Sequence, residues 1–160
     1  SSIGKIPTKI PYQPSIRHLS TLLQINDFDI DKTIGYFEKQ LVTEFDKNRL
    51  RTRAVCATNW VKKYAPVEFT FSVQEKCQVT LVDQEKKILN LFAQKLSEKE
   101  WTDKELHEEI YILAENNDID SKDLFALCYS VLINKAKGPR LASFILEIGR
   151  ERVAQLFKSV

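Results

Sequence analysis

Hydrophobic residues recur along most of the chain at intervals of three and four, the spacing of an amphipathic helix. A first helix is predicted after Ser15, which can act as its N-cap, and a second after Asp31. A third, longer helix carries a single apolar stripe and ends before Pro66. The apolar positions of these helices are Ile16, Leu19, Leu22 and Leu23, then Ile34, Phe37 and Leu41, then Leu50, Ala54, Ala57, Val61 and Tyr64.

The same spacing resumes near Thr80 and continues to the end of the chain. Thr102 and Glu105 have the spacing of a capping box, and Asp120 or Ser121 can cap the helix that follows. Pro139 is predicted in the first turn of the next helix, and Gly149 is predicted to end that helix in a left-handed conformation. The apolar positions are Leu81, Ile88, Leu89, Phe92, Leu96, Leu106, Ile110, Leu113, Leu124, Phe125, Cys128, Val131, Leu132, Leu141, Phe144, Ile145, Ile148, Val153, Leu156 and Phe157.

Residues 67–73, V-E-F-T-F-S-V, alternate apolar and polar side chains instead, which indicates extended backbone. No partner strand is evident, so we predict a packed connector, with a short strand as the alternative. The expected fold is all-α, with about eight helices in two packed groups of helix-cage-like architecture. The expected parts are a proline-rich linker at 1–14, a helical subdomain at 15–66, the connector at 67–79 and a helix-cage subdomain at 80–160.

The composition is that of a globular protein and not of a membrane or disulfide-rich protein. The 160 residues are 43% hydrophobic and 29% charged, which is typical of a globular protein, and no apolar run approaches the roughly 18 residues that cross a bilayer. Cys56, Cys77 and Cys128 are scattered, which favours reduced thiols in a cytoplasmic protein over a disulfide framework. The chain contains no methionine, even at its start, so we expect a piece of a longer protein.

Charge is unevenly distributed although the net charge is only +2. Residues 47–63 contain six basic residues and no acid, and residues 134–160 contain six basic residues against two acids. Residues 98–123, by contrast, contain ten acids and three lysines. The pattern predicts a polarised surface if the fold brings the two basic segments together, with the acidic segment facing away from an anionic partner or steering it by repulsion.

No catalytic constellation is evident in the sequence. His18 and His107 are the two histidines, and neither has neighbours at the spacing of a metal site. Four glycines cannot form a phosphate-binding loop, and no nucleophile elbow occurs. We therefore expect no catalytic residue, no metal and no cofactor in this chain.

Basic residues of the third helix are the first candidates for a binding site. Arg49, Arg53 and Trp60 are predicted on one face because they lie four and seven residues apart, whereas Arg51 points elsewhere. An aromatic ring among arginines can stack on an unpaired base while guanidinium groups hold phosphates. A solvated helix face with a core tryptophan is the alternative, and Lys62 can also simply complement the helix dipole.

The basic residues at 135–140 are the second set of candidates. Free N–H groups at a helix start, together with nearby cations, can bind an anion. Lys135, Lys137 and Arg140 would supply charge, Pro139 would fix the first turn, and Gly138 would leave room for a ligand to approach closely. An ordinary helix start is the alternative, because proline is common at this position.

Taken in order, several short motifs resemble a known family. They are YQPSIRHL at 12–19, LLQI at 22–25, RTRA at 51–54, NW at 59–60, KYAP at 63–66, ELHEEIY at 105–111 and INKAKGPRLA at 133–142. This series resembles the C-terminal region of class I, archaeal-type lysyl-tRNA synthetases, and it covers essentially the whole chain. The resemblance implies an all-helical anticodon-binding region similar to the helix cage of glutamyl-tRNA synthetases.

The resemblance also carries expectations about activity and partners. The parent enzyme joins lysine to tRNA with ATP through an aminoacyl-adenylate, using His-Ile-Gly-His-type and Lys-Met-Ser-Lys-Ser-type motifs that are absent here. The chain should therefore bind tRNA-Lys and its own catalytic domain, without a membrane or DNA partner, and should be inactive alone. Segments 51–53 and 135–140 are the implied anticodon contacts. The alternative is a helical protein-interaction domain anchored by arginine and Trp60, without an RNA role.

Overall fold

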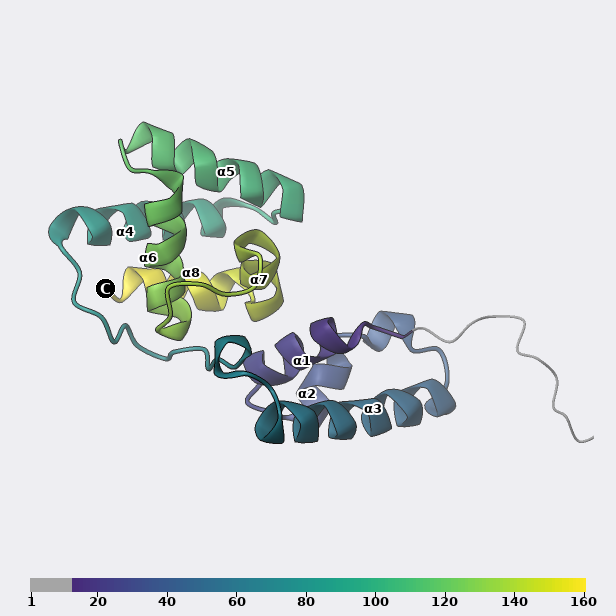
Figure 1. The fold of residues 1–160 in the computed structure, drawn as a ribbon. Helices are drawn as coiled ribbons and strands as arrows, with labels where there is room; N and C mark the ends of the chain where they lie inside the picture. The colour runs from purple at the N-terminus through teal and green to yellow at the C-terminus, as the bar shows by residue number, and fades with distance from the viewer. Residues whose placement is uncertain (1–12) are drawn as a thin grey trace, which may run out of the picture. The chain divides into compact units, whose positions relative to one another are not determined.

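The structure, a computed structural model, describes residues 13–160. Within this range it contains eight α-helices, two short 3-10 helices and no strand, so the prediction of an all-α fold with about eight helices is confirmed (Figure 1). The chain divides into two compact units, one ending at Pro66 and the other spanning Val67–Val160. The predicted linker at 1–14 lies almost entirely outside the described residues.

The first unit contains α1 (Ile16–Ile25), α2 (Ile30–Gly35), the 3-10 helix η1 (Glu38–Gln40) and α3 (Glu44–Lys63). Both α1 and α2 pack on α3. Ser15 caps α1 as predicted, with its hydroxyl accepting from the His18 amide at 3.1 Å. Thr43 and Asp46 form a reciprocal capping box at the start of α3. The predicted stripe of α3 is buried from Leu50 to Val61, but Tyr64 follows the helix and is 75% exposed.

The second helix starts earlier than predicted. Its cap is Asp29 and not Asp31, and the Asp29 carboxylate accepts from the Lys32 amide at 3.1 Å. The reason lies in the preceding turn, where Asp27 and Phe28 take positive φ angles of 52° and 63° and reverse the chain directly after α1. A single-residue pattern does not predict such a turn, because only a few per cent of residues other than glycine adopt positive φ.

The second unit contains η2 (Val67–Phe69), α4 (Asp83–Glu98), α5 (Asp103–Asn116), α6 (Ser121–Ile133), α7 (Leu141–Ile148) and α8 (Arg150–Lys158). Helix α8 packs along α4, while α5 packs on α6 and α7 (Figure 1). Phe92 of α4 and Phe157 of α8 meet edge to face at 5.5 Å between ring centroids. Asp120 caps α6, one of the two predicted residues, and Gly149 joins α7 to α8 with a φ of 108°.

Residues 67–82 form neither a strand nor a continuous helix. The segment begins with the 3-10 turn of η2, and hydrogen bonds and a ring contact hold it against later parts of the second unit. The Lys135 ammonium donates to the carbonyls of Val67 and Thr70, the Gln74 amide donates to the Leu132 carbonyl at 2.8 Å, and Phe71 packs on Phe144 with 5.1 Å between centroids. Because Leu132 and Lys135 provide hydrogen-bond partners for backbone groups of this segment, these groups do not need a partner strand.

Candidate nucleic-acid interface

The candidate residues on α3 lie on two opposite flanks of its buried stripe. At about 100° per residue, Arg49, Arg53 and Trp60 share one flank, and Arg51 and Lys62 share the other. The continuous helix from Glu44 to Lys63 thus brings together the three residues that the spacing grouped. Arg51 and Lys62, the other two candidates on this helix, lie apart from these three residues.

The flank with Arg51 and Lys62 contacts its own unit. Arg51 pairs with Asp31 at 2.8 Å, and the Lys62 ammonium lies 4.8 Å from the centroid of the Phe28 ring. The side chains of Arg51 and Asp31 are 50% and 79% exposed, and an exposed ion pair contributes only about 0–1 kcal/mol. Arg51 can therefore exchange this partner for a phosphate at small energetic cost.

The flank with Arg49, Arg53 and Trp60 has a different character. The Gln13 side-chain oxygen accepts from Arg49 Nη2 at 2.6 Å when its amide group is turned toward the guanidinium. Nη1 of Arg53 is buried and has no hydrogen-bond partner among the described residues. This atom is not open to a ligand, although Arg53 as a whole is only half-buried. Trp60 is 41% exposed, which leaves part of its ring accessible for stacking.

Residues 135–140 form a connection between helices and not the start of one. Helix α6 ends at Ile133, Asn134 caps it in the left-handed conformation with φ 55°, and α7 begins at Leu141. Pro139 therefore precedes Arg140, the N-cap of α7, and the prediction that it lies in the first turn is wrong. Its carbonyl instead accepts from the Tyr129 hydroxyl, which holds the connection against α6.

The space beside Gly138 is filled by this chain. A Cβ atom at this position would lie 2.9 Å from Ile133 Cδ1 and 2.9 Å from Tyr129 Cδ1. Real Cβ atoms do not approach other atoms so closely. Glycine here makes room for side chains of α6, so the expectation that it leaves room for a ligand is wrong.

The three cations of this connection have three different environments. Lys135 holds the carbonyls of Val67 and Thr70, and Arg140 pairs with Asp103. Lys137 is exposed and makes no hydrogen bond or ion pair within the described part of the chain. Lys137 is thus the cation of this segment that a phosphate can approach without displacing a partner.

The anion at the start of α7 is supplied by the protein itself. The Asp103 carboxylate accepts from the Arg140 guanidinium and from the Ser143 hydroxyl in the first turn of α7. This arrangement satisfies the positive charge and the helix start that were expected to bind a ligand anion. It also brings the acidic segment into contact with the basic one at Asp103, while the expectation that the acidic segment faces away from an anionic partner or steers it by repulsion stays a prediction.

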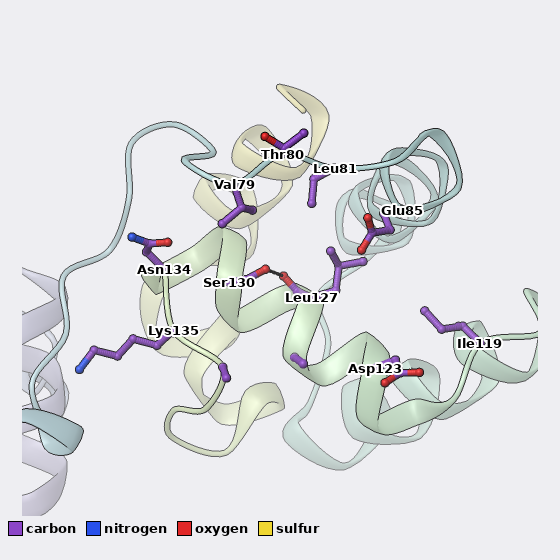
Figure 2. A pocket seen from close by; sticks show the side chains of 12 residues that line it. Val79, Thr80, Leu81, Glu85, Ile119, Asp123, Leu127, Ser130, Asn134 and Lys135 are labelled. Atoms are coloured by element: carbon purple, nitrogen blue, oxygen red, sulfur yellow. Dashed lines mark hydrogen bonds between the residues drawn. The ribbon is translucent and has the colours of Figure 1, made fainter.

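The structure also contains a cleft beside α6 that the sequence pattern does not predict. Its volume is about 680 Å³, and one face of α6, residues 79–81, Glu85 of α4, Ile119 and residues 134–136 line it. Figure 2 shows Asp123, Leu127 and Ser130 along the α6 wall, with Glu85 and Leu81 opposite. We name it the α6 cleft. Residues from Val79 to Ala136 contribute to it, so no local spacing could have predicted it.

Other reactive groups do not assemble into a site within residues 13–160. No group of three or more His, Cys, Asp or Glu side chains there could hold a metal ion. Burial lowers the pKa of His18 and raises the pKa of the Cys128 thiol to about 12, so that thiol stays protonated at neutral pH. None of the helices in this range is both long and apolar enough to span a membrane.

Comparison with known proteins supplies an independent view of the same segments. Residues 47–156 match the family described as "Anticodon binding domain". The chain is 34% identical over 157 residues to a lysine–tRNA ligase of Picrophilus torridus, covering 95% of the chain and 30% of that protein. It is 35% identical over 156 residues to a lysine–tRNA ligase of Borreliella burgdorferi, covering 94% of the chain and 30% of that protein. For the Thermococcus kodakarensis lysine–tRNA ligase the identity is 33% over 159 residues, with 95% and 30% covered. The chain thus spans about 30% of the length of these relatives, and the resemblance drawn from its motifs is confirmed.

Proposed function

The chain belongs to the anticodon-binding domain family, and we propose that it is the RNA-reading part of a class I lysine–tRNA ligase that recognises tRNA-Lys by its anticodon. The family match carries the proposal, because residues 47–156 include the basic segment at 47–63 with its Arg49, Arg53 and Trp60 flank and most of the basic segment at 134–160. The similarity to lysine–tRNA ligases over more than nine tenths of the chain supports lysine as the amino acid concerned.

The chemistry of an unpaired anticodon fits the side chains that remain accessible. Splayed bases expose flat faces and hydrogen-bonding edges, which aromatic rings, guanidinium groups and backbone donors can read. Lysine anticodons are rich in uridine, whose base offers two carbonyl acceptors and one N–H donor. Trp60 can stack on such a base, Arg49 and Arg53 can donate to its carbonyls, and Lys137 can hold a phosphate.

Aminoacylation belongs, in this proposal, to the rest of the parent protein. The parent would use ATP and lysine in a catalytic domain, which is one partner of this chain, while tRNA-Lys is the other. The chain itself would bind neither ATP nor lysine and would be inactive alone, since it carries neither synthetase motif. A cytoplasmic location remains a prediction from the reduced cysteines.

Binding of tRNA-Lys tests the proposal. Fluorescence anisotropy with a labelled tRNA-Lys transcript should show binding that weakens steeply between about 50 and 200 mM salt. A transcript identical except for an exchanged anticodon should bind at least tenfold more weakly, an effect of about 1.4 kcal/mol. Equal affinity for both transcripts would contradict anticodon reading. No affinity for either, together with stoichiometric co-purification of a protein, would favour the protein-interaction domain.

A further inference from the structure

The α6 cleft has an apolar floor that the protein leaves uncovered. Val79, Leu81 and Ile119 line it and are only partly buried, while Leu127 is buried beneath them. The volume of about 680 Å³ lies within the range of roughly 300–1,000 Å³ that is usual for small-ligand sites. The cleft can therefore take a flat apolar group the size of a nucleobase.

Hydrogen-bond acceptors dominate the polar part of the cleft. The Asp123 carboxylate has no partner among the described residues. One oxygen of Glu85 accepts from the Val82 amide at 2.9 Å, which leaves the other available. The hydroxyl of Ser130, which lines the cleft, donates to the Leu127 carbonyl at 2.7 Å (Figure 2), so toward a ligand its oxygen can serve as an acceptor.

Positive charge is directed away from this site. Lys135 lines the cleft at one end, but its ammonium is bound to the carbonyls of Val67 and Thr70, and Figure 2 shows it pointing away from Glu85 and Asp123. Lys135 is the cation among the described residues that line the cleft, so the two carboxylates of the cleft repel a phosphate or a carboxylate. A ligand must instead bring hydrogen-bond donors of its own.

We propose that the α6 cleft binds an unpaired nucleobase that carries an exocyclic amino group, in the same RNA loop that the domain reads. Adenine, cytosine and guanine have such a group, whereas uracil offers two acceptors and a single donor. The carboxylate of Asp123 accepts from the amino group, and the apolar floor contacts the face of the base. This inference rests on the proposed function for the identity of the ligand as RNA. It assigns the cleft to a base other than the uridines of the anticodon.

The neighbouring residues connect this cleft to an RNA backbone. Ala136 lines the cleft, and the next residue is Lys137, the exposed cation that makes no hydrogen bond or ion pair within residues 13–160. Adjacent Cα atoms are about 3.8 Å apart, so a phosphate at Lys137 places the attached nucleotide beside the cleft. The connection between α6 and α7 thus offers a phosphate contact at Lys137 next to the base site in the α6 cleft.

The inference is tested by measuring the affinity of the chain for a synthetic anticodon stem–loop of tRNA-Lys and for variants of this RNA that each lack one exocyclic amino group. Each loop adenosine is replaced in turn by purine riboside, which removes only the amino group, and each loop cytidine by uridine. The 160-residue chain should lose about tenfold in affinity at one loop position and little at the others. In the Asp123→Ala variant, the same replacement should change the affinity less than about twofold, because the acceptor is already gone.

Two further variants separate a base contact from general repulsion. Glu108→Ala removes a carboxylate from an exposed position of α5 outside the cleft, and it should leave the tenfold discrimination intact. Ala126→Phe narrows the cleft from the α6 wall and should weaken the parent stem–loop to the level of its purine-riboside form. Thermal melting of each variant excludes unfolding as the cause.

Two results would overturn the inference while leaving the proposed function in place. One is a wild-type chain that distinguishes tRNA-Lys from an exchanged anticodon but is insensitive to every amino-group replacement. The other is an Asp123→Ala variant that binds every RNA more tightly by the same factor and keeps the full discrimination, which would make Asp123 a source of repulsion only. A wild-type chain that does not bind the stem–loop at all contradicts the inference and the proposed function together.

Discussion

Replacement of Gly138 by alanine should destabilise the second unit, because the added methyl group has no room. Its Cβ would lie 2.9 Å from Tyr129 Cδ1 and 2.9 Å from Ile133 Cδ1. Ile133 can turn its terminal methyl, but the Tyr129 ring is held by its hydroxyl, which donates to the Pro139 carbonyl. The ring or the 135–140 connection must therefore move, and overpacking of this kind costs about 1–3 kcal/mol.

Two other glycines provide matched controls for this substitution. A Cβ at Gly35 meets no atom of residues 13–160 within 4 Å, so Gly35→Ala at the end of α2 should stabilise the first unit by about 0.4–1 kcal/mol. The described residues also leave space at Gly149, but its φ of 108° and ψ of 122° are rarely adopted by other residues, so Gly149→Ala should destabilise by roughly 1–3 kcal/mol through backbone strain alone. The three variants thus separate crowding, strain and backbone entropy.

Urea unfolding followed by tryptophan fluorescence measures the effect in the correct unit. Trp60 lies in the first unit and Trp101 in the second, where its indole N–H donates to the Lys95 carbonyl at 2.9 Å. In a Trp60→Phe background, the fluorescence reports the second unit. An unchanged unfolding midpoint for Gly138→Ala, alongside a lowered one for Gly149→Ala, would refute the argument that Tyr129 and Ile133 fill this space.

Three further predictions concern charged residues of the second unit. Lys137→Ala should weaken RNA binding and lower the slope of log affinity against log salt by about 1, as measured by anisotropy. Lys135→Ala should leave that slope unchanged and lower the unfolding free energy, as measured by urea titration. Asp103→Asn should tighten RNA binding by releasing Arg140, with a loss of less than about 1 kcal/mol in unfolding free energy, since the pair is exposed. Burial raises the pKa of Glu147 from 4.5 to about 7, so the folded state keeps a proton that the unfolded state releases and stability should fall as pH rises across this window. Glu147→Gln should remove that loss, so the variant should unfold at higher urea than wild type at pH 8 but not at pH 4.

The helices and their buried faces could be predicted from the sequence because the evidence for them is local. On α3, Leu50, Ala54, Ala57 and Val61 recur at the helical period and are all buried. Hydrophobic burial along such a stripe does not depend on which element covers it. The number of helices and the all-α class therefore follow from spacing alone.

The ends of helices were less predictable, because tertiary contacts decide them. Pro139 is compatible with a first helical turn, yet α7 begins two residues later. The difference comes from Tyr129, ten residues earlier, whose hydroxyl binds the Pro139 carbonyl and keeps the connection against α6. In the same way, the two positive φ angles after α1 move the start of α2 toward Asp29. Neither cause is visible in the few residues around the helix start.

The candidate site shows the limit of reading charge from a sequence. Lys135, Lys137 and Arg140 carry the same charge, but Lys135 and Arg140 have partners that lie far away in the chain. Arg140 meets Asp103 at a separation of 37 residues, and Lys135 meets Val67 at a separation of 68. Since an ammonium that already holds two carbonyls must lose them before it can bind a phosphate, Lys135 serves the fold more than the ligand. The number of basic residues in a cluster therefore overstates the number of phosphate contacts. The salt dependence of RNA binding should come mainly from Lys137 and from Arg49 and Arg53 on α3, and little from Lys135 and Arg140.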